Sequence, residues 1–123
     1  MAAPNLKNPS VITGKTGRYA VPLASGGLPV AMLSNSASSN KVFKINSIFC
    51  ANVDGTNPAD ISVSIYDGTT DFYLAKTIAV PADATQIIST KETYFYLEEG
   101  DSIRAVANAA DDLELVIGYE DIS

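Results

Sequence analysis

Hydrophobic and polar residues alternate with a period of two along most of the chain from Arg18 onward. Polar turns separate the alternating segments at intervals of about 8–12 residues, and no segment shows the helical period of 3.6. The pattern therefore predicts eight or nine short strands, at residues 19–23, 29–33, 41–53, 61–66, 72–80, 86–90, 93–97, 103–107 and 113–119.

Two prolines indicate how the strands are arranged. Pro22 and Pro29 cannot donate a backbone hydrogen bond, so they favour edge strands or strand starts over central positions. Edge strands occur in an open sandwich and are absent from a closed barrel, so the two prolines favour the sandwich. We therefore expect an all-β fold, an antiparallel β-sandwich with a jelly-roll-like arrangement.

The longest alternating segment, residues 41–53, predicts which side chains share a face of the sheet. One face would carry Phe43, Ile45, Ser47, Phe49, Ala51 and Val53, and the other Lys44, Asn46, Cys50 and Asn52. Cys50 is expected to be a buried small hydrophobic residue, because a catalytic thiol would need a base and the chain has no histidine.

The first residues differ from the rest. Residues 1–17 are expected to form an extended N-terminal arm, and residues 18–123 the β-sandwich domain. An arm of this composition cannot bury itself, so we expect its own domain or a neighbouring molecule to hold it. The residues predicted to contact a partner are the large apolar and basic ones of this region, namely Leu6, Lys7, Val11, Ile12, Lys15, Arg18 and Tyr19.

Composition excludes most chemistry. The 123 residues suit one domain, and they include one cysteine, no tryptophan and no histidine. Catalytic units and zinc sites that use imidazole are therefore excluded, as is an internal disulfide. The sequence predicts no catalytic residue, no metal ligand and no cofactor, and it gives no indication of a small-molecule ligand.

Charge is divided unevenly along the chain. Residues 1–59 contain five basic side chains and one acidic one, whereas residues 60–123 contain three basic and thirteen acidic ones. The formal net charge of −6 argues against nucleic acid as the main partner, and the sparse basic residues of the arm argue against a membrane surface. We expect the basic arm to lie on an acidic protein surface.

Acidic and aromatic clusters leave alternatives open. The acidic turns at 54–60, at 67–71 and around Asp111 and Asp112 could be calcium loops, but ordinary turn chemistry explains them better. The adjacent acids Glu98, Glu99 and Asp101 cannot face each other across a cleft as glycosidase carboxylates do. Exposed tyrosines could bind carbohydrate, the candidates being Tyr66, Tyr73, Tyr94, Tyr96 and Tyr119.

No segment has the apolar stretch of a secretion signal or a membrane span. Together with the single cysteine, this predicts synthesis in the cytoplasm.

Four strings along residues 41–121 resemble a known family. They are KVFKINSIFCANVDG at 41–55, ADISVSIYD at 59–67, AVPADATQII at 79–88 and YLEEGDSIRA at 96–105. In this order they are similar to small β-sandwich virion proteins of tailed bacteriophages, particularly phages of cyanobacteria and other marine bacteria. The chain departs from that pattern at Asp83, where glycine is common, so the turn there is expected to differ.

The resemblance implies a non-enzymatic structural protein of the virion. Capsid decoration, in which the protein cements the capsid by bridging neighbouring subunits, is the role it favours. The implied partners are the major capsid protein, other copies of the chain in a homo-oligomer, or both, and the implied location is the capsid surface after synthesis in the host cytoplasm. The alternatives are a neck or tail accessory protein, or a carbohydrate- or receptor-binding module of a tail fibre.

Overall fold

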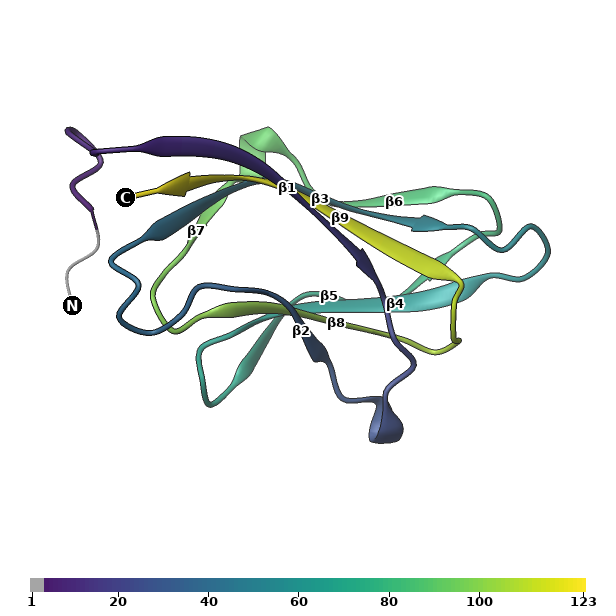
Figure 1. Cartoon of the computed structure of the whole chain (residues 1–123). Helices are drawn as coiled ribbons and strands as arrows, with labels where there is room; N and C mark the ends of the chain where they lie inside the picture. Colours follow the sequence, from purple (N-terminus) through teal and green to yellow (C-terminus); the bar gives the residue numbers. More distant parts are fainter. Residues whose placement is uncertain (1–3) are drawn as a thin grey trace.

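The computed structural model describes residues 4–123, which form two antiparallel sheets packed face to face (Figure 1). Eight of the nine segments predicted from the alternating pattern contain a strand, and the segment 19–23 overlaps a strand only at Tyr19 and Ala20. The strands are β1 (Ile12–Ala20), β2 (Val30–Ser34), β3 (Val42–Asn52), β4 (Ala59–Tyr66), β5 (Asp71–Val80), β6 (Thr85–Ser89), β7 (Phe95–Leu97), β8 (Ser102–Ala107) and β9 (Leu113–Ile122), with short 3-10 turns η1 (Ser25–Gly27) and η2 (Lys91–Thr93).

The strand pairs are nested. β4 pairs with β5, β3 with β6 and β7, β2 with β8, and β1 with β9. The chain thus folds as one long double-stranded ribbon wrapped into two sheets, in the orders β1-β9-β3-β6 and β2-β8-β4-β5. This arrangement confirms the expected all-β, antiparallel sandwich.

The core lies between the two sheets. Its fully buried side chains include Ile45, Ile48, Leu115 and Ile117 from one sheet and Ile61, Val63 and Ile103 from the other. Cys50 belongs to the same cluster, which confirms its predicted burial. Removal of these apolar side chains from water is the main force that holds the sheets together.

A β-bulge in β3 makes part of the predicted face assignment wrong. The pairing of β3 with β9 shifts between Ile45 and Ser47, so one extra residue, Asn46, enters the strand. Because strand side chains alternate, one extra residue reverses the faces beyond it. Phe43 and Ile45 share one face, as predicted, and that face is on the core. Farther along β3 the core receives Ile48, Cys50 and Asn52 instead, while Phe49 and Val53 are 37% and 50% exposed.

The turns follow the predicted chemistry in part. Asp67 and Gly68 form the tight β4–β5 hairpin, with Gly68 at φ 99°. The turn at residues 54–58 is not a hairpin, since it carries the chain from β3 in one sheet to β4 in the other. Asp83 adopts φ 57°, the left-handed conformation that glycine adopts without strain.

The expected boundary of the N-terminal arm was wrong, because β1 begins at Ile12. Nine consecutive residues of β1 pair in unbroken register with β9, so Ile12–Gly17 are part of the sheet. Of the remaining arm, residues 1–3 lie outside the described residues. A polar, glycine-containing segment forms a strand here because β9 offers it a complete row of backbone partners, which its own alternation does not indicate.

Candidate interaction surfaces

The segment before β1 is tied to the end of the chain. The amides of Ser10 and Val11 donate to the carbonyl of Ser123, at 2.7 and 3.1 Å, and the Ser123 amide donates back to the Val11 carbonyl at 2.9 Å. Yet the large apolar side chains here are not covered: Leu6 is 47% exposed, Val11 55% and Ile12 54%. These three residues and the exposed Lys7 are called the arm surface below.

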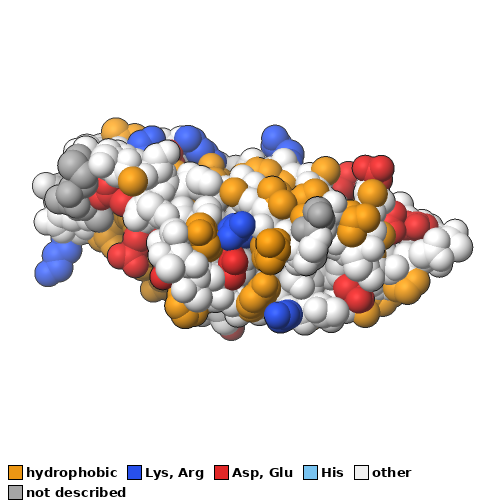
Figure 2. Space-filling model, turned by 90° about the horizontal axis from the view of Figure 1, so that it is seen from below, with side chains coloured by type: hydrophobic (Ala, Val, Ile, Leu, Met, Phe, Trp, Pro, Cys, Tyr) orange, Lys and Arg blue, Asp and Glu red, His pale blue; other side chains and the backbone are white. Residues whose placement is uncertain are grey.

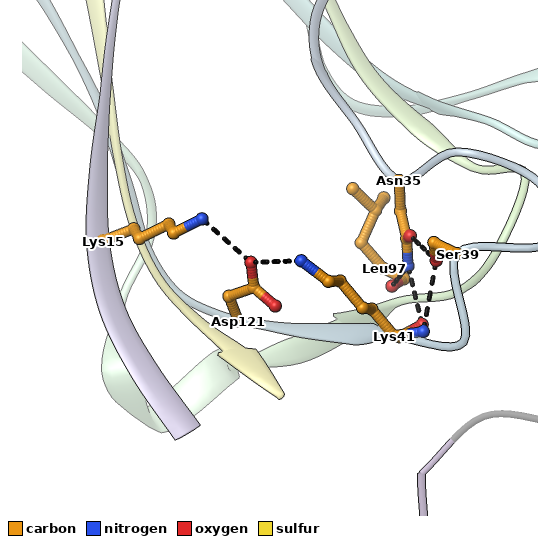
Figure 3. Close-up of polar contacts among 6 residues, drawn as sticks. All are labelled: Lys15, Asn35, Ser39, Lys41, Leu97 and Asp121. Carbon is orange, nitrogen blue, oxygen red and sulfur yellow. Dashed lines mark hydrogen bonds and ion pairs between the residues drawn. The ribbon is translucent and has the colours of Figure 1, made fainter. Parts of the chain in front are cut away.

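Lys15, which the sequence predicts to contact a partner, is already paired with a carboxylate of its own chain. Its Nζ atom lies 2.9 Å from Oδ2 of Asp121, and Nζ of Lys41 lies 3.3 Å from the same oxygen (Figure 3). Burial alone would raise the pKa of Asp121, but the hydrogen bonds and charges of the two lysines outweigh it and hold that pKa below its usual range. The basic N-terminal half of the chain is therefore neutralised in part by its own acidic half.

Arg18 and Tyr19 also lie in β1. Arg18 is exposed and lines a shallow recess with Glu114 and Val116 of β9. Tyr19 packs against the core cluster, and its ring lies over Gly17, where any side chain would overlap it. Of the seven predicted contact residues, Lys15 and Tyr19 thus have partners within the chain, and Leu6, Lys7, Val11, Ile12 and Arg18 are exposed.

Two buried asparagines hold the loops that flank β3. The Nδ2 atom of Asn35 donates to the carbonyls of Lys41 and Leu97, at 2.9 and 3.0 Å (Figure 3). At the other end of the strand, Nδ2 of Asn52 donates to the carbonyls of Asn57 and Val80, at 3.0 and 2.9 Å. Buried amides satisfied in this way give loops one conformation.

The acidic turns have structural roles. Oδ1 of Asp54 accepts the amides of Thr56 and Asn57, and Oδ1 of Asp67 accepts those of Thr69 and Thr70. These backbone hydrogen bonds hold the pKa of both aspartates below the usual range. Among residues 4–123, no three cysteine, aspartate or glutamate side chains gather in a way that could hold a metal ion.

The remaining reactive groups are also accounted for. Burial raises the pKa of the Cys50 thiol to about 11, so at neutral pH it is protonated and a poor nucleophile. Burial likewise raises the pKa of Asp101, whose Oδ2 accepts the Glu98 amide at 3.2 Å, while Oε2 of Glu99 accepts the Asn40 amide at 3.2 Å.

Within the described part of the chain, no helix is long and apolar enough to cross a membrane.

A cluster on the outer face of the β2-β8-β4-β5 sheet has no counterpart in the sequence analysis. The guanidinium of Arg104 lies 3.1 Å from Oδ2 of Asp71 and 4.2 Å from the centre of the Tyr66 ring, and the buried Ser64 hydroxyl donates to Asp71 at 2.8 Å. Arg104 and Asp71 are 33 residues apart, so only the register of β4, β5 and β8 brings them together.

The tyrosines do not form one platform. Tyr66 and Tyr73 lie on strands of one sheet, whereas Tyr94 and Tyr96 stack edge to face beside β3 of the other, with Nζ of Lys44 4.4 Å from the Tyr94 ring centre. Tyr119 packs against Phe43, with ring centres 5.2 Å apart. The arrangement therefore lacks the shared aromatic face that tyrosine-based carbohydrate binding would use.

The fold defines the chain as an antiparallel β-sandwich protein. No protein-family model matches it, and no curated protein sequence is significantly similar to it. Among solved structures it is similar to a pentameric capsid protein from metagenomic phage sequences, with 17% identity, a TM-score of 0.39, and coverage of 87% of this chain and 64% of that one.

A second solved structure, the VP2 subviral particle of infectious bursal disease virus, is similar with 15% identity and a TM-score of 0.34. The match covers 93% of this chain, which spans only 33% of the VP2 chain. Both neighbours are described as viral capsid or particle proteins. Likeness at these TM-scores does not establish a shared function.

Proposed function

We propose that the chain is a non-enzymatic structural protein of a tailed-phage virion that decorates the capsid and bridges neighbouring subunits. The observation that carries the proposal is the arm surface. Leu6, Val11 and Ile12 are each about half exposed, although backbone hydrogen bonds to Ser123 hold the end of this segment in place. A positioned segment with uncovered apolar side chains is suited to packing against another protein.

The basic residues indicate which kind of partner surface the arm surface would face. Lys7 adds a positive charge beside Leu6, and Arg18 of β1 adds another, while the chain as a whole has a net charge of −6. An acidic patch on a capsid subunit, or on another copy of this chain, therefore complements the arm surface. Exposed ion pairs contribute only about 0–1 kcal/mol each, so the apolar residues supply most of the affinity and the charges orient the partner.

Rebinding to virus particles that lack the protein tests the proposal. The wild-type chain is expected to co-sediment with the particles, and the double variant Leu6→Ser with Val11→Ser is expected to lose most of that binding. Leu28→Ser is the matched control, because Leu28 is 67% exposed but lies beyond the opposite end of β1, next to η1. Equal binding of wild type and double variant would contradict the role of the arm surface, and binding only at the neck or tail would contradict capsid decoration.

A further inference from the structure

A recess of about 290 Å³ lies on the outer face of the β2-β8-β4-β5 sheet, beside the loop that contains η1. Figure 2 views this face, on which hydrophobic side chains are interspersed with separate charged ones. The side chains that line the recess include Leu23, Asp60, Ser62, Thr77, Val106 and Asn108. Its volume is just below the range of roughly 300–1,000 Å³ that is usual for small-molecule sites, which suits one ring-sized group.

The polar groups of the recess are held in position. Asp60 and Asn108 fix each other, because Oδ1 of Asn108 accepts the Asp60 amide at 2.8 Å and Nδ2 of Asn108 donates to the Asp60 carboxylate at 3.3 Å. No cationic side chain within residues 4–123 forms an ion pair with Asp60. Its carboxylate thus presents acceptor capacity to the recess, and Asn108 has a second amide hydrogen to donate.

A bulge in β5 brings Thr77 to the same wall. The β4–β5 register shifts between Ile61 and Val63, and the Thr77 amide donates to Oγ of Ser62 at 2.9 Å. Thr77 adopts φ 53°, a conformation that is strained for a β-branched residue and that glycine would adopt freely. Bulges of this kind re-aim side chains, and here the result is a threonine on the wall of the recess.

We propose that this recess binds one sugar unit of a neutral saccharide. Hydroxyl groups both donate and accept, so adjacent sugar hydroxyls match the acceptor of Asp60, the donor of Asn108 and the hydroxyls of Ser62 and Thr77. Leu23, which is 57% exposed, and Val106 offer an aliphatic surface for the C–H face of the ring. The uncompensated carboxylate of Asp60 disfavours anionic ligands such as uronates and sugar phosphates.

This inference is independent of the proposed capsid role. The arm surface is beside the C-terminus, at the end of the sandwich where β1 begins, whereas η1, whose loop borders the recess, lies toward the other end (Figure 1). Both surfaces are therefore available on one molecule, and loss of one activity leaves the other measurable.

Backbone amide NMR with a panel of sugars tests the inference. Glucose, galactose, mannose and N-acetylglucosamine are titrated into the labelled chain, with glucuronate and glucose 6-phosphate as anionic counterparts. At least one neutral sugar is expected to shift the amide signals of Ser62, Thr77 and Asn108 with a Kd on the order of 1 mM. Absence of such shifts for every neutral sugar at tens of millimolar, or stronger binding of an anionic sugar, would overturn the proposal.

Two variants separate binding from folding. Asp60→Asn is expected to raise the Kd for the sugar roughly tenfold, because it removes one charged hydrogen-bond acceptor. Glu114→Gln on the other sheet is expected to leave that Kd unchanged. Thr77→Gly removes the hydroxyl and relieves the backbone strain, so it should weaken binding while leaving the melting temperature unchanged or higher. Wild-type affinity in both Asp60→Asn and Thr77→Gly would contradict the assigned contacts.

Discussion

The Nζ atom of Lys15 lies 2.9 Å from Oδ2 of Asp121, and this contact joins the first strand of the sandwich to the last. The side chain of Asp121 is 7% exposed and also accepts from Lys41, so one carboxylate links β1, β9 and the residue just before β3. The sequence places the basic residues in one half of the chain and the acidic ones in the other, and the fold brings part of the two sets together.

Asp121→Asn is expected to lower the free energy of unfolding by about 1–2 kcal/mol at neutral pH, between the values for an exposed and a buried ion pair, since both lysines are partly exposed. The native pKa of Asp121 is below the unfolded value of about 3.9. The stabilisation is therefore present above about pH 4 and is lost as the pH falls through the native pKa.

Urea unfolding of wild type and Asp121→Asn at neutral pH and near pH 2 measures this difference. The two proteins are expected to converge as the pH falls through the native pKa of Asp121, because its carboxylate then becomes neutral as well. Glu114→Gln, an exposed carboxylate on the same strand, is the control and should have little effect. A stability difference that stays constant across the pH range would contradict the ion-pair account.

Two N-terminal truncations should behave differently. Deletion of residues 1–9 leaves β1 and the hydrogen bonds between Val11 and Ser123 intact, so it is expected to change the melting temperature little. Deletion of residues 1–16 removes Lys15 and more than half of the β1–β9 pairing, so it is expected to lower the melting temperature markedly. Calorimetry of both truncated proteins checks this, and equal melting temperatures would show that β1 does not contribute to the folded domain.

Replacement of the buried Asn52 side chain should lower the free energy of unfolding far more than replacement of the exposed Asn57 side chain nearby. Asn52→Ala leaves the Val80 carbonyl without this donor and the Asp54 amide without its acceptor, so the expected loss is about 2–3 kcal/mol. Asn57→Ala keeps the backbone carbonyl that Asn52 contacts and should cost less than about 0.5 kcal/mol. Denaturant unfolding of the two variants compares them, and losses of similar size would contradict the role assigned to Asn52.

The left-handed backbone at Asp83 predicts a stabilising substitution. Asp83→Gly removes the strain at φ 57° and is expected to raise the free energy of unfolding by about 0.5–1 kcal/mol. Asp83→Ala keeps the strain without the tolerance of aspartate for this conformation, so it should be less stable than wild type. Thermal unfolding of the three proteins tests the order, which would be refuted if alanine stabilised as much as glycine.

Alternation identified the strands other than β1, because each has one face on the core. The burial of Cys50 was expected instead from its residue type and from the absence of histidine. Alternation could not identify the bulge at Asn46, since one inserted residue leaves the local pattern intact while it reverses the faces beyond. Nor could it predict β1, whose partner β9 is about a hundred residues away.

The paired polar residues could not be predicted from local sequence either. Lys15 with Asp121, Arg104 with Asp71, and Asp60 with Asn108 are pairs separated by 106, 33 and 48 residues. Strand register creates each of them, and no local motif marks either partner. The apolar residues of the arm surface stand out in the sequence because the segment around them is otherwise polar, and their contact with a partner stays a prediction.

The most direct test of the central claim is a cryo-EM map of the virion that contains this protein. If the protein decorates the capsid, the map is expected to show density for the β-sandwich on the outer capsid surface, with Leu6, Val11 and Ile12 buried against a neighbouring subunit. A virion that lacks this density on its capsid, or one in which these three side chains face solvent, would contradict that claim.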